Sequence, residues 1–404
     1  MKILFVHDAK TVKDTENHIY TDTSYNMKVW NRYLKHCDEF TVILRQQSKE
    51  ISTEIAKSRY NYMDTSRIRY VPIPDLMNPK TNYFSYFIRK KHRNIIKQEV
   101  KKADFIIVRL PSASGHIALN YAKRTNKKYL IEVVGDPFIS LWYYGNIYGK
   151  VLAPISSLKM KRDIKHSTNI IYVSQRFLQN LYPTKNRSIG IPDVFLDPPN
   201  ISVLNKRIQR INSMNKDVIK LGLIGSLDVV YRGHETLLKA ATLLKSKQIN
   251  VEIHFLGPGN IPMMMNKAKK YNVENETKCD GTLPSGEAVY NWIDNIDILV
   301  MPTKAETLGR AIIEAMSRGC PVIGSLETAI GEQIGSDCLI KSDDYIGIAN
   351  IILKMINNKK YMLSCAYENY YRSFKYTTEQ TDLIRDNFIK LCLNEGEDKY
   401  NVIL

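Results

Sequence analysis

The sequence predicts an α/β fold with two doubly wound domains that face each other across a cleft. The chain has 404 residues, which at about 100 to 200 residues per domain suggests two or three domains. Short apolar runs alternate with longer mixed segments, as expected of buried parallel strands joined by crossover helices. The alternation stops at a polar stretch, residues 200–217, and then begins again, which indicates a second domain of the same kind.

The N-terminal half contains apolar runs of strand length, each followed by a segment long enough for a helix. The strands of this half are expected at Lys2–Val6, Phe40–Leu44, Ile68–Ile73, Phe105–Val108, Tyr129–Val134 and Asn169–Val173. The second half repeats the pattern, with strands expected at Ile219–Gly225, Val251–Gly257, Ile296–Met301 and Pro321–Gly324. Residues 345–393 carry apolar side chains at spacings of three and four, which predicts helices throughout.

The stretch Pro192–Pro199 and the basic, polar run after it predict the junction between the domains, because Pro and polar residues disfavour a buried core. We therefore expect an N-terminal domain over residues 1–195, a linker over 196–217 and a C-terminal domain over 218–375. Residues 376–404 are expected to form a helical segment that packs back on the N-terminal domain.

The chain is strongly basic, with 58 Lys and Arg against 41 Asp and Glu and a net charge of +17. Its surface field therefore favours anionic partners: nucleic acid, anionic lipid or phosphorylated small molecules. The six cysteines show no paired spacing and no zinc-ligand pattern, which indicates reduced thiols of a cytoplasmic protein. No run approaches the roughly 20 apolar residues that span a bilayer, so any membrane contact is expected to be peripheral.

Ligands of doubly wound sheets bind beyond the carboxyl ends of the strands, so two facing domains place both binding edges on one cleft. Residues directly after the expected strands are therefore candidates for the site. They are His7, Asp8, Arg109, Gly135, Asp136, Gly225, Ser226, Gly257, Pro302 and Thr303.

The most informative segment is Met301–Ser325, which reads as strand, turn, helix and strand. Leu308 and Gly309 are expected to open the helix and Gly319 to close it. The unpaired N–H groups of such a helix start bind phosphate. Glu306 and Glu314, one before the helix and one inside it, then face one ligand from different depths. A carboxylate accepts two hydroxyl hydrogen bonds, so the pair suits a sugar and a ribose; the alternative is a capping Glu306 and a solvated Glu314.

The spacing of Glu306 and Glu314 resembles the E-x7-E signature of retaining GT-B glycosyltransferases of family four, the group 1 type. The run from Ala315 to Ile323 is similar to the bacterial members that build capsular and other surface polysaccharides. The resemblance extends to Gly225–Leu227, Tyr231–Leu238 and, more loosely, Glu132–Pro137. It implies the GT-B fold, two Rossmann-like domains, and transfer of a hexose-type sugar from a nucleotide-diphosphate donor, with UDP and GDP both open.

The resemblance also implies roles for the donor side. Glu306 is expected by the donor sugar as the catalytic carboxylate, and Glu314 on the nucleotide ribose. Arg232 takes the place of a diphosphate-binding Lys, and its fork suits phosphate oxygens. Ser226 stands where many relatives have a second basic residue, so that contact falls to Arg310 or Lys304. Thr307, Leu308 and Gly309 complete the expected donor site.

The acceptor side carries weaker signals. Asp136, after the central strand, is expected to be catalytic, with a helix cap as the alternative. His7, Arg109 and His116 are the other acceptor-side candidates. The first loop lacks the glycines of many relatives, since no Gly lies between Asp8 and Val29.

Cations and helix N-termini stabilise a leaving diphosphate, and no Asp-x-Asp element follows a strand, so metal-independent transfer is expected. Retention in this family is explained by same-face attack; a nucleophilic Glu306 is the rival role. The run Tyr83–Lys102, aromatic and then densely basic, and the patch Lys159–Lys165 fit an anionic membrane surface, with a solvated basic face as the alternative. A lipid-linked or oligosaccharide acceptor at the inner face of the cell membrane follows from the resemblance.

Specific sequence features decide which other classes of protein remain as alternatives. No helix-turn-helix, RRM or zinc-finger pattern supports nucleic-acid binding, and His7–Lys10 lacks the G-x-G-x-x-G of a dinucleotide-dependent oxidoreductase. A nucleotide-sugar epimerase of the same shape and a non-catalytic GT-B scaffold stay as alternatives.

Overall fold

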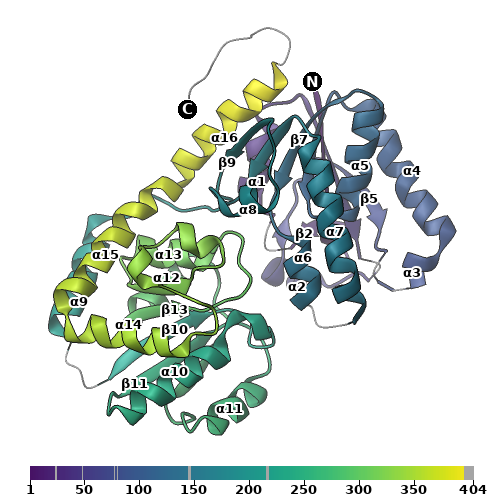
Figure 1. Cartoon of the computed structure of the whole chain (residues 1–404). Helices are drawn as coiled ribbons and strands as arrows, with labels where there is room; N and C mark the ends of the chain where they lie inside the picture. The colour runs from purple at the N-terminus through teal and green to yellow at the C-terminus, as the bar shows by residue number, and fades with distance from the viewer. Residues whose placement is uncertain are drawn as a thin grey trace.

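The computed structural model describes residues 1–22, 25–47, 49–76, 78–79, 81–143, 147–214 and 218–394. It consists of two α/β domains, with the first half of the chain at upper right in Figure 1 and most of the second half at lower left. The last helix runs from the C-terminal domain back along the N-terminal one, so the chain crosses between the domains twice.

The described residues of the N-terminal domain form a nine-stranded sheet in the order β4-β2-β1-β6-β7-β8-β9, with β3 between β1 and β5. The strands are β1 (Lys2–Lys13), β2 (Ile19–Thr21), β3 (Glu39–Gln46), β4 (Asn61–Tyr62), β5 (Arg69–Pro74), β6 (Phe105–Leu110), β7 (Lys128–Val133), β8 (Asn169–Tyr172) and β9 (Arg187–Gly190). All pairs are parallel except β1 with β2 and β2 with β4.

The strands of this sheet are apolar on both faces because helices cover both. Leu4, Ile106 and Ile131 pack in one cluster, while their neighbours Ile3 and Phe105 pack in another, as the two-residue period of a strand requires. The helices are α1 (Met27–Leu34), α2 (Thr53–Arg59), α3 (Thr81–Phe84), α4 (Tyr86–Lys102), α5 (Ala113–Arg124), α6 (Pro137–Tyr143), α7 (Ile147–Lys165) and α8 (Phe177–Leu181). Buried side chains of α4, α5 and α7 join the first cluster, and those of α1 join the second.

The C-terminal domain has a parallel six-stranded sheet in the order β12-β11-β10-β13-β14-β15. The strands are β10 (Ile219–Ile224), β11 (Val251–Leu256), β12 (Thr277–Gly281), β13 (Ile298–Met301), β14 (Val322–Ser325) and β15 (Leu339–Ile340). Its helices are α9 (Ile201–Ser213), η1 (Val230–Arg232), α10 (His234–Ser246), α11 (Ile261–Lys270), α12 (Glu287–Asp294), α13 (Arg310–Ser317), η2 (Ala329–Glu332), η3 (Ser336–Cys338), α14 (Tyr345–Asn357) and α15 (Lys359–Ser373), followed by η4 (Phe374–Tyr376) and α16 (Thr378–Leu393).

The expected α/β class and every expected strand are present, whereas β2, β4, β9, β12 and β15 are short strands that were not expected. The linker differs from the prediction of residues 196–217, because 201–213 form helix α9. Arg207 of α9 donates to the carbonyl of Ile293 at 2.8 Å and also to that of Ile296, which fixes α9 to the C-terminal domain. The first crossing is therefore made by residues 191–200, which form neither helix nor strand and which we call the crossing segment.

Helix α16 packs on the N-terminal domain, where Phe388 and Ile389 join the cluster that contains α1. Its Arg385 lies 3.0 Å from Glu132 of β7. The expected segment 376–404 reaches beyond this helix, and residues 395–404 lie outside the described part of the chain.

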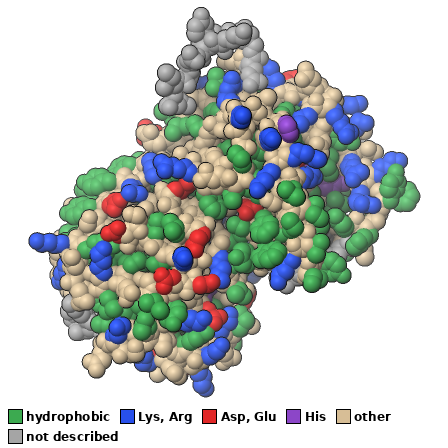
Figure 2. Space-filling model, in the orientation of Figure 1, with side chains coloured by type: hydrophobic (Ala, Val, Ile, Leu, Met, Phe, Trp, Pro, Cys, Tyr) green, Lys and Arg blue, Asp and Glu red, His purple; other side chains and the backbone are tan. Residues whose placement is uncertain are grey.

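On the face drawn in Figure 2, Lys and Arg side chains are spread over the N-terminal domain, and most visible Asp and Glu lie on the C-terminal one. None of the six cysteines forms a disulfide. Within the described residues, none of the helices combines the length and the apolar character needed to cross a bilayer.

Candidate active site

A cavity of about 800 Å³ lies between the domains, at the carboxyl ends of the strands of both sheets. The C-terminal domain contributes the segments after β10 and β13 and the start of α13. The N-terminal domain contributes the middle of β1 and the end of β6, and the crossing segment also lines the cavity. The lining residues predicted from sequence are His7, Asp8, Arg109, Gly225, Arg232, Glu306, Thr307, Leu308, Arg310 and Glu314.

The start of α13 forms the wall of the cavity on the C-terminal side. Gly309 precedes the helix in the left-handed region, at φ 72°, which favours glycine. A Cβ at Gly309 would lie 2.8 Å from Oε1 of Gln333, whose Nε2 donates to the carbonyl of Leu308. The predicted helix start is therefore present, with Gln333 as a support that sequence reasoning missed.

Glu306 and Arg232 form an ion pair in the cavity, with Nη1 of Arg232 donating to Oε2 of Glu306 at 2.7 Å. The second oxygen of Glu306 accepts from the backbone N–H groups of Thr307 at 3.2 Å and Leu308 at 3.4 Å. The carboxylate is thus held in one orientation by its own turn and by a residue that follows β10, the strand beside β13 in the sheet.

Two glycines set the position of Arg232. Gly233 has φ 86°, and a Cβ there would lie 2.3 Å from the carbonyl oxygen of Pro302. At Gly225, an added Cβ would lie 3.3 Å from the side chain of Arg232. The turn before α10 can therefore lie against Pro302, after β13, only because Gly233 lacks a side chain, and Gly225 leaves room for the Arg232 side chain.

Glu314 lies one turn after Arg310 on α13, and both line the cavity. Burial raises the pKa of Glu314, and the charge of Arg310 opposes that rise. A desolvated carboxylate of this kind is stabilised when hydroxyl groups of a ligand donate hydrogen bonds to it.

Of the two candidates for a second cation, Arg310 lines the cavity. Lys304, the other candidate, forms an ion pair with Asp343 at 2.7 Å and does not line it. Ser226 also lies outside the lining, while its neighbour Gly225 belongs to it. Thr307 reaches across the cleft, and its hydroxyl donates to the carbonyl of Val134 in the N-terminal domain at 3.3 Å.

On the N-terminal side, β1 is longer than expected and irregular in the middle. Its register against β3 shifts between Val6 and Lys10, and His7 and Asp8 lie within that irregularity, facing the cavity. The Nδ1 atom of His7 accepts from the backbone N–H of Ala9 at 3.1 Å and contacts the hydroxyl of Tyr25 at 2.9 Å. Burial and the charge of Arg109 hold the pKa of His7 well below its ordinary value, so the ring is neutral and Nε2 carries the proton.

Asp8 lies against the first turn of α5, where its carboxylate accepts from the amide and hydroxyl of Ser114 and the amide of Ala113. Burial alone would raise its pKa, but the hydrogen bond from Ser114 and the nearby charges lower it. Asp8 is therefore an ionised carboxylate in the N-terminal wall of the cavity.

Arg109 lines the cavity but is already paired. Its Nη2 donates to Asp193, and its guanidinium lies 5.3 Å from the ring centre of Tyr25. Asp193 also pairs with Arg32 at 2.7 Å, and Arg32 pairs with Asp382 of α16 at 2.7 Å. The network ties the crossing segment and the last helix to the N-terminal wall of the cavity.

Two of the predicted acceptor-side residues do not lie in the cavity. Asp136 accepts from the backbone N–H of Phe138 at 2.8 Å and from the hydroxyl of Tyr182, which makes it the cap of α6 and not a group that faces the cleft. His116 lies on α5 with its Nδ1 atom 2.7 Å from Asp163 of α7, and it joins two helices. The prediction of a catalytic Asp136 and an acceptor-side His116 is therefore wrong on position.

Sequence reasoning also missed several residues that line the cavity. The crossing segment contributes Asp193, Val194 and Phe195, which belong to the stretch predicted as the junction between the domains. The loop before α1 contributes Asp22, Tyr25 and Asn26, and β3 contributes Arg45. The clearest signal was that of Arg45, which directly follows the expected strand Phe40–Leu44.

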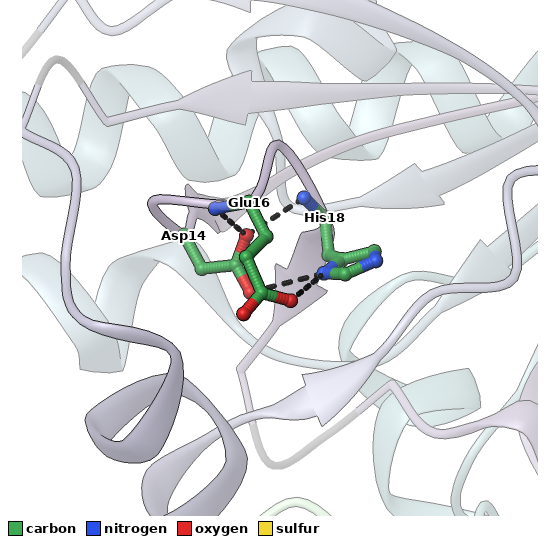
Figure 3. A group of neighbouring side chains, drawn as sticks. All are labelled: Asp14, Glu16 and His18. Atoms are coloured by element: carbon green, nitrogen blue, oxygen red, sulfur yellow. Dashed lines mark hydrogen bonds and ion pairs between the residues drawn. The ribbon is translucent and has the colours of Figure 1, made fainter.

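Among the described residues, one group has the spacing of metal ligands: Asp14, Glu16 and His18 (Figure 3). It lies on the β1–β2 hairpin, and its members do not line the cavity. Asp14 accepts the backbone N–H groups of Glu16 at 3.0 Å and His18 at 2.8 Å, so its carboxylate closes the hairpin turn. We assign the group no role in the active site.

Two facing parallel sheets with a cavity at their carboxyl ends define the GT-B class of glycosyltransferase folds. HepE of Anabaena in complex with UDP-glucose matches with a TM-score of 0.64 and 14% identity, over 97% of this chain and 100% of that one. Sucrose-phosphate synthase of Thermosynechococcus elongatus matches with a TM-score of 0.65 and 13% identity, over 98% and 100%.

The sequence comparisons identify the family. The model of glycosyl transferases group 1 matches residues 219–358, which is most of the C-terminal domain. Over 386 residues the chain is 31% identical to Protein CapJ of Staphylococcus aureus, covering 96% of this chain and 94% of that protein. The chain belongs to the group 1 glycosyltransferases, which confirms the resemblance based on Glu306 and Glu314.

Proposed function

We propose that this glycosyltransferase moves a hexose-type sugar from a nucleotide-diphosphate donor to a lipid-linked saccharide acceptor, with retention, during assembly of a bacterial capsule or similar polysaccharide. One observation carries the proposal: Arg232, Glu306 and Glu314 line the same cavity, and Arg232 pairs with Glu306. The complex of HepE with UDP-glucose supports a nucleotide-sugar donor. The likeness to CapJ supports the pathway.

The proposed donor lies along the start of α13. Arg232 offers five N–H donors, of which the bond to Glu306 uses one, so others are left for diphosphate oxygens. Arg310 adds a second cation, and the backbone N–H groups at the helix start face the developing negative charge. Glu314 accepts hydrogen bonds from the ribose hydroxyls. We propose that these groups stabilise the leaving diphosphate without a metal ion.

The proposed chemistry is a same-face substitution. The bond between the anomeric carbon and the phosphate oxygen breaks, and the acceptor hydroxyl oxygen bonds to that carbon on the same face. The hydroxyl proton passes to the departing phosphate oxygen, so no protein nucleophile is required. Glu306 stabilises the positive charge that develops on the sugar, and its orientation is fixed before the reaction by Arg232 and the amides of Thr307 and Leu308.

The proposed acceptor lies against the N-terminal wall. Neutral His7 presents Nε2–H, and ionised Asp8 adds a carboxylate, so this wall offers both a donor and an acceptor for saccharide hydroxyls. The lipid part of the acceptor would remain in the inner face of the cell membrane.

Calorimetric binding of UDP, GDP and their sugars tests the donor site in the wild type, Arg232→Ala and Glu314→Ala. We expect one nucleotide to bind tightly and both variants to weaken it by about tenfold or more. Lys304→Ala is the matched control, because this neighbouring cation lies outside the cavity and its loss should leave binding unchanged. A folded wild type that binds none of these nucleotides would overturn the proposal.

Product analysis separates the transferase from the other classes. With donor and a membrane extract, a transferase yields a glycosylated lipid whose new linkage keeps the donor configuration, as NMR measures. An epimerase converts the donor alone into a second sugar nucleotide, and a scaffold leaves the donor unchanged. Either of the last two results would contradict the proposal.

A further inference from the structure

Helix α7 carries apolar side chains on two opposite faces. Gly149, Ala153, Met160 and Ile164 are buried against the N-terminal domain. On the other face, apolar side chains are exposed, with Tyr148 at 76% and Leu158 at 67% of full exposure. We call this exposed set the α7 strip: Ile147, Tyr148, Val151, Leu152, Ile155 and Leu158.

The α7 strip is continuous. At 3.6 residues per turn its six members fall within an arc of about 140°, and the buried stripe occupies the opposite side. Scattered apolar residues are normal on a protein surface, whereas a contiguous apolar face marks an interaction site. A surface helix needs one apolar face for packing, so packing within the domain explains the buried stripe and leaves the strip unexplained.

Positive charge accompanies the strip. The same helix carries Lys150, Lys159, Lys161, Arg162 and Lys165. Its one acidic residue, Asp163, is buried and bonded to His116. Figure 2 shows hydrophobic side chains gathered over α6 and α7, with Lys and Arg side chains beside them. An apolar strip bordered by cations complements a surface that is apolar inside and anionic outside.

A second element at the same end of the domain has the same composition. The N-terminal ends of α4 and α7 both lie at the lower end of the N-terminal domain in Figure 1. Around the start of α4, Phe84 is 79% and Phe87 81% exposed, and Arg89, Lys90 and Lys91 follow. Exposed aromatic rings followed by cations are typical of residues at the level of lipid headgroups.

The hairpin that carries the strip also touches the donor side of the cavity. Tyr143, at the end of α6, packs against Tyr231 with ring centres 5.5 Å apart. Tyr231 directly precedes Arg232, which pairs with Glu306. The contact between these two rings therefore connects the surface of α6 and α7 to the turn that carries Arg232.

From these contacts we infer that the α7 strip docks on an anionic lipid bilayer, with its apolar side chains in the headgroup region and the α7 and α4 cations on lipid phosphates. The charge distribution favours a bilayer over a second copy of this chain, because two copies would bring the same cations together. The inference deepens the proposed function and rests on it for the acceptor, since docking here places the mouth of the cavity beside the membrane that holds a lipid-linked saccharide.

Co-sedimentation with vesicles tests the docking surface, using phosphatidylcholine with about 30% phosphatidylglycerol against phosphatidylcholine alone. The test variant is Ile155→Ser with Leu158→Ser, which removes apolar area from exposed positions without a change in charge. The matched control is Ile346→Ser with Leu383→Ser, at positions that are 50% and 57% exposed on α14 and α16. Thermal unfolding of each variant verifies the fold.

We expect the wild type and the control to bind the anionic vesicles, and the strip variant to partition about tenfold or more less strongly. Equal binding by the folded strip variant, or no binding by the wild type, would overturn the inference. A concentration-dependent dimer in sedimentation velocity that the strip variant abolishes would also overturn it, by assigning the strip to a second copy. Nucleotide binding in the same samples reports on the proposed function separately, since the strip lies outside the cavity.

Discussion

Glu306 and Arg232 are 74 residues apart in the chain, yet their side chains form a 2.7 Å ion pair inside the cavity. Each comes from the end of a different strand unit, β13 for Glu306 and β10 for Arg232. The pair therefore joins the segment expected to hold the sugar to the one expected to hold the diphosphate. A carboxylate fixed in this way is pre-oriented for charge that develops during the reaction.

For Glu306→Gln we expect kcat to fall by about 10² to 10³, with donor affinity changed by less than about threefold. The amide keeps the shape of the side chain and its acceptor oxygen, but it removes the negative charge. Steady-state kinetics with calorimetric donor binding separate the two effects. Glu235→Gln, a carboxylate on α10 that bonds to Tyr271 outside the cavity, is the control and should leave both unchanged. Unchanged kcat with weakened binding would make Glu306 a binding residue alone.

For Gly309→Ala we expect a loss of about 2 kcal/mol or more in the free energy of unfolding, with weaker nucleotide binding. Alanine is strained at φ 72°, and its Cβ would displace the buried Gln333, whose Nε2 holds the carbonyl of Leu308. Gly281→Ala is the control, because Gly281 has φ 73° and no atom within 4 Å of an added Cβ. That variant should lose only the backbone contribution, about 1 kcal/mol, and keep nucleotide binding. Equal losses in denaturant melts of the two variants would show that the Gln333 contact contributes nothing.

Local signals in the sequence predicted the segment that carries Glu306 and Glu314. Gly309, Gly319 and Pro321 are local signals, so the strand, turn and helix that carry Glu306 and Glu314 were predictable, as was the family. Arg232 was predicted from the family resemblance, as the basic residue directly before Gly233.

The acceptor side was less predictable because long-range contacts decide it. Arg109 meets Asp193, 84 residues away, and Arg32 meets Asp193 across 161. Nothing local in residues 192–199 distinguishes such a partner from a polar linker. Asp136 shows the reverse case, since a polar residue after a central strand looks the same whether it faces the cleft or caps the next helix.

For Glu314→Gln we expect higher thermal stability without ligand and weaker nucleotide binding. Burial raises the pKa of Glu314 above its ordinary value of 4.5, so the folded state keeps this proton to higher pH than the unfolded state does. Stability therefore falls as pH rises from about 4.5 through the raised pKa, and the full penalty is present above it. The Tm advantage of Glu314→Gln should be near zero at pH 4 and roughly 1 to 3 °C at pH 7.

Differential scanning calorimetry across this pH range measures the effect, with Glu274→Gln as a half-buried carboxylate outside the cavity. A variant that is less stable than the wild type at pH 7 would show that Glu314 has a favourable partner in the free protein. The expected opposition between stability and binding is typical of a carboxylate kept desolvated for a ligand.

For Asp193→Asn we expect the largest loss of stability among these variants, about 3 to 5 kcal/mol. The substitution leaves the buried guanidinium groups of Arg32 and Arg109 facing a neutral amide. Arg32 also pairs with Asp382, so this network joins the crossing segment to α16. Burial alone would raise the pKa of Asp193, but the charges of Arg109 and Arg32 hold it well below its ordinary value, so the carboxylate is ionised at every pH where the protein would be assayed.

The control for this variant lies four residues further along the same crossing segment. Asp197 is exposed, so Asp197→Asn keeps the charge change and omits the buried network; we expect less than about 0.5 kcal/mol. Urea unfolding measures both variants, and acceptor KM should rise for Asp193→Asn while donor affinity holds, because Arg109 lines the N-terminal wall. If the two variants unfolded at the same urea concentration, the Arg32–Asp193–Arg109 contacts would contribute no net stability. The crossing segment would then be held by its buried apolar residues, Val194 and Leu196.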